Sequence, residues 1–137
     1  MGSPMIDQLE KGNSMNQHDL FIVGRCLIAA MFIVSALGKA ANWRTTIDLM
    51  RLHHLPLPSA ALFVSVVAEF TGAIFLLIAR FMYPTVGVLF AFVASATVAI
   101  PLQDAVKGKD RGNAISIIGS NLAILGALLL VLGLSDR

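Results

Sequence analysis

Four apolar runs, each long enough to cross a membrane, constrain the fold of this chain more than any other feature of its sequence. A bilayer core about 30 Å thick is crossed by about 20 apolar residues in a helix. Backbone polar groups inside lipid have no water to bond, so such a run is expected to be helical. The sequence therefore predicts an all-α membrane protein, a bundle of four transmembrane helices at about residues 20–38, 59–79, 83–102 and 114–133.

The remaining residues leave no room for a second domain. The chain has 137 residues, of which 57% are hydrophobic and 13% charged, and its mean hydropathy is +0.81. We expect a polar N-terminal tail over residues 1–19, a transmembrane domain over residues 20–134 and a C-terminal tail over residues 135–137. Connections this short cannot fold into a soluble catalytic or nucleic-acid-binding domain. Membrane lipids, and no nucleic acid, are therefore the expected partners.

A short amphipathic segment follows the first span. Trp43, Ile47 and Met50 are spaced i, i+4 and i+7, which places them on one face of a helix. A helix with this pattern is expected to lie in the membrane interface, with its tryptophan at headgroup depth. The Leu-Pro-Leu-Pro of residues 55–58 ends it, because proline donates no backbone hydrogen bond and disfavours helix in the preceding residue.

Two opposite charges lie within the apolar runs, Arg25 in the first span and Glu69 in the second. A charge in lipid is costly unless protein or water interacts with it. Counted at about 1.5 Å per residue from the loop between these spans, the two residues differ in depth by about 5 Å. We therefore expect a buried polar network formed by an Arg25–Glu69 ion pair, which Asn121 of the fourth span can join.

Two roles are open for this network, and a third alternative is that the span boundary is misplaced and Arg25 lies near the lipid head groups. In the first, the ion pair only fixes the helix packing, and Asn121 makes an interhelical hydrogen bond. In the second, Glu69 takes up and releases a proton or bonds a bound head group, because intramembrane acids often mark such pathways. Helical spacing places each charge on a stripe with particular neighbours: Ala29, Phe32, Ala36 and Lys39 with Arg25, and Ser65, Gly72 and Leu76 with Glu69. Gly87, Ala91 and Ser95 form a further stripe of small residues in the third span, interpreted as a helix-packing feature.

A second group of polar residues is expected near one membrane surface, where the loops meet. It is a possible surface site formed by Lys39, Trp43, His53, His54, Gln103 and Asp104. Adjacent histidines point in different directions and no third ligand has metal-like spacing, so we expect no metal. No hydrolase, metalloprotease, P-loop or dinucleotide motif occurs, and the single Cys26 excludes an internal dithiol. We therefore assign no catalytic residue and do not expect the chain to catalyse a reaction by itself.

The loops also carry most of the positive charge, which predicts an orientation. The two loops at residues 39–58 and 103–113 contain Lys39, Arg44, Arg51, Lys107, Lys109 and Arg111, whereas the opposite side has Lys11, Arg80 and Arg137. Loops rich in lysine and arginine face the cytoplasm. We therefore expect both loops in the cytoplasm and both termini on the opposite side of the membrane.

Three segments resemble the DoxX family of small four-span bacterial membrane proteins. They are the opening GRCLIAAMFIVSALGKAANW, the L-P-L-P entry to the second span followed by the glutamate of AEFTGAIFLL, and NLAILGALLLVLG in the fourth span. The chain departs from the family at Ala36, where many relatives have glycine. It also has IPLQD where many relatives close the third span with a histidine and aromatic cluster. The resemblance implies a multi-pass protein of the bacterial inner membrane.

The resemblance also implies a role near quinone or thiol redox chemistry, because the family is named for a subunit associated with quinol oxidation. The leading hypothesis is a non-catalytic subunit or assembly partner of a larger, quinone-linked membrane redox complex. The alternative is a quinone- or lipid-binding protein with a pocket between the spans around Glu69. A small oligomeric transporter is a weaker alternative. No covalently bound cofactor is expected, whereas quinone or lipid is a possible ligand.

Overall fold

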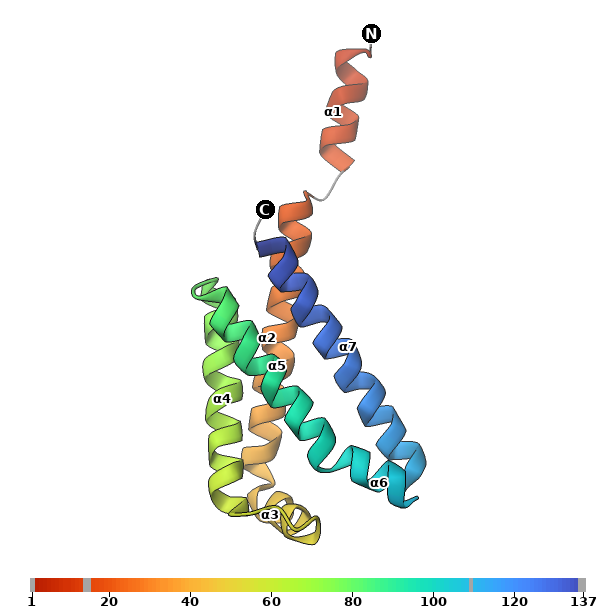
Figure 1. Cartoon of the computed structure of the whole chain (residues 1–137). Coiled ribbons are helices and arrows are strands. Elements are labelled where there is room, and N and C mark those ends of the chain that lie inside the picture. Colours follow the sequence, from red (N-terminus) through yellow and green to blue (C-terminus); the bar gives the residue numbers. More distant parts are fainter. Residues whose placement is uncertain (1, 14–15, 109, 136–137) are drawn as a thin grey trace.

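The computed structural model describes residues 2–13, 16–108 and 110–135, and helices make up most of this part of the chain (Figure 1). Four of its helices are long and apolar enough to cross a membrane, which confirms the predicted fold class. The helices that contain these spans are α2 (Gln17–Ala41), α4 (Pro58–Ile78), α5 (Met82–Ala99) and α7 (Arg111–Ser135).

Three shorter helices lie outside the long ones. The helix expected after the first span is present as α3 (Trp43–Leu52), and its Ile47 is buried. The segment expected as a polar tail contains α1 (Pro4–Asn13), which extends beyond the bundle in Figure 1. Helix α5 ends at Ala99, and α6 (Pro101–Lys107) follows it within the same candidate span. Proline lacks the backbone N–H that would continue the ladder of α5, which explains the break.

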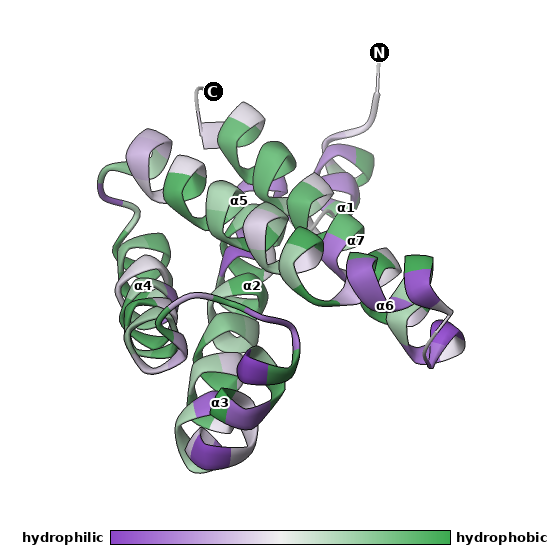
Figure 2. Cartoon of the chain, turned by 60° about the horizontal axis from the view of Figure 1, so that its bottom comes forward, coloured by the Kyte–Doolittle hydropathy of each residue, from purple (hydrophilic) through white to green (hydrophobic). Residues whose placement is uncertain are grey.

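The long helices alternate in direction, so the molecule has two distinct ends. The start of α2, the α4–α5 turn and the end of α7 lie at one end, which we call the termini end (Figure 1). Helices α3 and α6 lie at the other, the loop end. Figure 2 shows hydrophilic residues gathered on α1, α3 and α6, whereas the long helices are mostly hydrophobic. This distribution suits helices whose outer surfaces face lipid.

The core lies where α2, α4, α5 and α7 meet. Its largest buried side chains include Phe32, Leu76, Leu89 and Leu128. The stripes predicted beside both charges face inward: Ala29, Phe32 and Ala36 are buried on α2, and Ser65, Gly72 and Leu76 are buried on α4. The predicted small-residue stripe of the third span does not pack inside this chain, because Gly87, Ala91 and Ser95 are exposed.

One close contact between α4 and α5 depends on glycine. A Cβ atom at Gly72 would lie 2.5 Å from Cδ2 and 2.8 Å from Cγ of Leu89. Leu89 is fully buried, so its side chain would have to shift within the core to make room. By contrast, a Cβ atom at Gly87 would meet no atom within 4 Å.

We therefore predict that Gly72→Ala destabilises the protein, because overpacking a filled core costs about 1–3 kcal/mol. Gly87→Ala is the matched control, and it should be neutral or slightly stabilising because alanine favours helix more than glycine. Thermal unfolding of both variants in mild detergent measures the difference. Equal melting temperatures for the two variants would contradict this account of the α4–α5 contact.

Candidate functional site

A buried ion pair joins the first two spans near the middle of α4. Oε1 of Glu69 accepts a hydrogen bond from Nζ of Lys39 at 2.5 Å and another from Oγ of Ser35 at 3.3 Å. Glu69 is 2% exposed, whereas 28% of the Lys39 side chain remains accessible. The charges of Lys39 and Glu69 therefore neutralise each other within the bundle, where an isolated charge would be strongly disfavoured.

The predicted Arg25–Glu69 pair is wrong. Nη2 of Arg25 instead donates a hydrogen bond of 3.5 Å to the carbonyl oxygen of Leu77. The guanidinium carbon also lies 5.4 Å from the centre of the Phe21 ring. Leu77 belongs to the last turn of α4, where carbonyl groups lack helical partners and the helix dipole favours a cation. Arg25 thus interacts with the C-terminal end of α4 and not with Glu69.

The error lies in the axial register of α2 against α4. The depth count assumed that Lys39 and Pro58 lie at the same level. In the structure Lys39 reaches Glu69, which is eleven residues after Pro58 and about 16 Å further along the helix. Helix α2 continues to Ala41, and α3 with its following turn then covers the distance back to the start of α4. The sequence showed which faces meet but not how far one helix is shifted along the other.

Two other helices complete the surroundings of the ion pair. Nζ of Lys39 lies 5.0 Å from the centre of the Phe92 ring on α5, a cation–π contact. On α7, Nδ2 of Asn121 donates to Oγ1 of Thr97 at 2.8 Å, and that hydroxyl donates to the carbonyl of Val93 at 2.7 Å. The side chain of Asn121 therefore joins α7 to α5. The three residues expected to form one network, Arg25, Glu69 and Asn121, instead each bond a different partner.

Glu69 and Asn121 nevertheless face the same cavity, which has a volume of about 370 Å³. Four polar side chains line it: Ser35, Lys39, Glu69 and Asn121. Its remaining lining is apolar and comes from Met31, Phe32, Phe92, Val93, Ala96, Ile100, Pro101, Ile117 and Ile124. Oε2 of Glu69 is buried and has no hydrogen-bond partner in the described part of the chain. This combination of apolar walls and a few convergent polar groups is typical of small-molecule sites.

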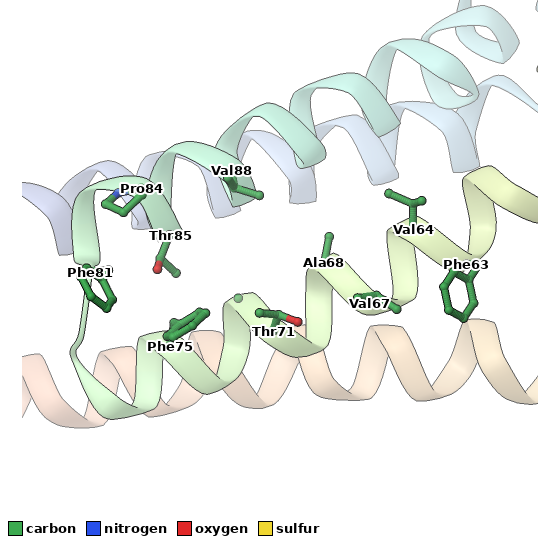
Figure 3. Close-up of a pocket in the computed structure, with 11 residues that line it drawn as sticks. Phe63, Val64, Val67, Ala68, Thr71, Phe75, Phe81, Pro84, Thr85 and Val88 are labelled. Carbon is green, nitrogen blue, oxygen red and sulfur yellow. The ribbon is translucent and has the colours of Figure 1, made fainter.

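A larger cleft on the other side of α4 has a different character. It has a volume of about 560 Å³ and lies between α4 and the start of α5, as Figure 3 shows. Thr71 and Thr85 are the polar residues in its lining, and the rest is apolar. Aliphatic and aromatic groups can fill such a cleft, but it offers no charged group to orient a ligand. The candidate site is therefore the smaller cavity around Glu69.

The loop-end residues proposed as a surface site are only partly brought together. Nε2 of His53 lies 2.8 Å from Oδ1 of Asp104, which joins the end of α3 to α6. Lys39 turns inward to Glu69, and His54 is exposed. Trp43 and Gln103 are half-buried. Among the described residues, no group of three or more His, Cys, Asp or Glu side chains is arranged to hold a metal ion.

The environment of His53 raises its pKa. Nδ1 lies 2.9 Å from the carbonyl oxygen of Leu49, and this backbone hydrogen bond is the largest cause, followed by the hydrogen bond to Asp104. Both ring nitrogens face acceptors, so both bonds form only when the ring carries two protons. The resulting stability is fully present below the unfolded pKa of about 6.5 and is lost as pH rises through the higher folded pKa.

We predict that Asp104→Asn lowers stability by about 1 kcal/mol at pH 6, because it removes a partly buried charged hydrogen bond. The difference from wild type should shrink as pH rises through the raised pKa of His53. Thermal unfolding at pH 6 and at higher pH measures it. Asp48→Asn is the control, because its contact with Arg51 is exposed; a pH-independent effect of Asp104→Asn would contradict the prediction.

A double-mutant cycle distinguishes the observed ion pair from the one expected from the sequence. Lys39→Gln and Glu69→Gln should be non-additive, with an interaction energy of about 0.5–3 kcal/mol, because their side chains touch. Arg25→Gln and Glu69→Gln should add to within about 0.5 kcal/mol. Reversible unfolding in mixed micelles measures both cycles. Strong coupling between Arg25 and Glu69, or none between Lys39 and Glu69, would refute the pairing described above.

Comparison with known proteins places this site within a protein family. The family described as DoxX matches residues 20–102, more than half of the chain, and this range includes Lys39 and Glu69 but not Asn121. No curated protein and no solved structure matches the chain. Together with its four membrane-crossing helices, the family match shows that the chain is a multi-pass membrane protein and belongs to the DoxX family.

Proposed function

We propose that this protein binds a small neutral molecule of the quinone class, with its head group in the cavity between the spans. The observation that carries the proposal is Oε2 of Glu69, a carboxylate oxygen that is buried without a partner in the described chain and belongs to a cavity-lining residue. Burying an acceptor without a hydrogen bond is costly. A ligand hydroxyl, such as that of a quinol, supplies the missing donor.

The neighbouring side chains suit this chemistry. Lys39 and Ser35 both bond Oε1 of Glu69, so Oε2 remains available as an acceptor. Asn121, which also lines the cavity, donates its amide nitrogen to Thr97, and its amide oxygen is a second acceptor group. A quinol has two hydroxyl donors on a flat ring, and the apolar walls supplied by α2, α5 and α7 suit the ring faces and the hydrocarbon tail.

Charge favours a neutral quinone or quinol over a phospholipid head group at this position. The Glu69 carboxylate repels an anionic phosphate, and Lys39 is already paired with it. The volume of about 370 Å³ falls within the range of about 300–1,000 Å³ found for small-molecule sites. The cavity therefore suits the ring of a quinone, with its tail directed into lipid.

Quinone retention tests the proposal. The paired change Lys39→Gln with Glu69→Gln removes both charges together and leaves no unpaired ion. It should lower the quinone extracted per purified protein about tenfold, because a charge-assisted hydrogen bond is lost. The measurement is chromatography of organic extracts from protein in nanodiscs made with quinone-containing membrane lipids.

Thr71→Val is the matched control, because Thr71 lies on the same helix but lines the cleft of Figure 3. It should retain quinone at the wild-type level. Circular dichroism checks that both variants keep their helices. A folded double variant that retains as much quinone as wild type would rule out the cavity as the binding site.

A second role, as a non-catalytic accessory subunit of a larger membrane redox complex, is favoured by the outer surface of α5. Gly87, Ala91 and Ser95 are exposed there at intervals of four residues, and small residues allow a partner helix to approach closely. Gly87→Leu should then release the protein from a complex that co-purifies in mild detergent. Recovery of the wild-type protein only as a free monomer would count against this role.

We also propose that the protein lies in a bacterial inner membrane, with α3 and α6 on the cytoplasmic side. Arg44 and Arg51 lie on α3, Lys107 ends α6 and Arg111 begins α7, in agreement with the positive-inside rule. A C-terminal reporter that is active only outside the cytoplasm should therefore be active. An inactive, stably expressed fusion would reverse the orientation.

A further inference from the structure

The guanidinium of Arg25 has no carboxylate partner within the part of the chain that the structure describes, where the ion pairs involve other residues. Its Nε atom is buried with no hydrogen-bond partner there. Its hydrogen bond to the Leu77 carbonyl is long, at 3.5 Å. Because a guanidinium carries five N–H donors, the protein uses only a small part of its bonding capacity. A persistent positive charge is therefore available to a ligand.

The position of Arg25 is close to the termini end of the bundle. Leu77 lies one residue before the end of α4, and the exposed Arg80 follows in the turn to α5. Arg25 itself lies eight residues after the start of α2, or about 12 Å along the helix. An arginine at this depth can extend its charged end to the level of the lipid head groups.

Two clefts meet at Arg25. The first, of about 490 Å³, lies between α2 and α7 and is lined by apolar residues that include Leu20, Ile28 and Ala127. The second, of about 500 Å³, lies between α2, the start of α5 and the end of α7, and includes His18 and Met82. A basic group flanked by two mainly apolar clefts matches the general form of a lipid, which has an anionic head and two hydrocarbon chains.

We propose that Arg25 binds the phosphate of an anionic membrane lipid whose acyl chains occupy these two clefts. Because Nε is covered by protein, the phosphate meets the terminal nitrogens of the guanidinium. His18 also lines the second cleft and adds a ring N–H that can donate a hydrogen bond. The nearest acid on the same helix, Asp19, is exposed and lies six residues away on a different face. This site is separate from the Glu69 cavity, whose carboxylate disfavours a phosphate.

Native mass spectrometry of the purified protein tests this site. The probe is an equal mixture of phosphatidylglycerol and phosphatidylcholine with the same acyl chains, added to the detergent-solubilised protein. Wild type should retain phosphatidylglycerol about fivefold more than phosphatidylcholine, because one basic group near the surface supplies this much preference for an anionic lipid. Arg25→Gln should lose the preference. Arg80→Gln, which changes an exposed arginine at the same end, should keep it.

A second variant keeps the test decisive if Arg25→Gln does not fold. Ala127→Phe fills the cleft between α2 and α7 without changing the charge, and it should also reduce phosphatidylglycerol retention. Inorganic phosphate, added at the same molar excess over protein as the lipid mixture, should not displace the lipid, since it has no acyl chains to fill the clefts. Equal retention of both lipids by wild type, undiminished retention by folded Arg25→Gln or Ala127→Phe, or displacement by inorganic phosphate would each overturn the proposal.

Discussion

The contact between Lys39 and Glu69 is the constraint on which the bundle depends. Glu69 is 2% exposed, and a carboxylate at such a position must be paired or protonated. Lys39 approaches from α2, so the first two spans are fixed in axial register as well as in facing direction. Removing one partner of such a pair is strongly destabilising, because the other charge then stays buried without a partner. Replacing both partners by apolar residues is often neutral. The pair therefore specifies one arrangement of α2 and α4.

Arg25 makes a different kind of contact at the other end of the same two helices. It donates to Leu77 in the last turn of α4, where carbonyl groups have no helical partners. Thus two cations of α2 contact α4, Lys39 through an ion pair and Arg25 through the end of the helix. The second contact is weak by its length and leaves most of the guanidinium uncommitted. Lys39 therefore acts mainly within the bundle, whereas Arg25 has hydrogen-bond donors left for the proposed lipid.

The sequence was sufficient for the four long helices and for the buried faces of α2 and α4, but not for the contacts between the charges. Apolar run length predicted four spans, and helical spacing correctly placed Ala36 and Gly72 on inward faces. Such patterns repeat along a helix and contain no information about how far one helix is shifted along another. That shift is set by α3 and its following turn, whose path is a property of the folded chain. A lysine in the last turn of α2 was the signal that was missed, since its long side chain can reach back into the bundle.

The cavity beside the ion pair follows from the break between α5 and α6. Pro101 cannot continue the hydrogen-bond ladder of α5, and Ile100 and Pro101 both line the cavity. Helix α7 packs along α5 and α6, so it diverges from α2 toward the loop end in Figure 1. Apolar side chains fill the junction near Leu128, but at the level of Glu69 the separation of α2 and α7 leaves room for a ligand. The proline at the break between α5 and α6 thus accounts for the space beside the unpartnered oxygen of Glu69.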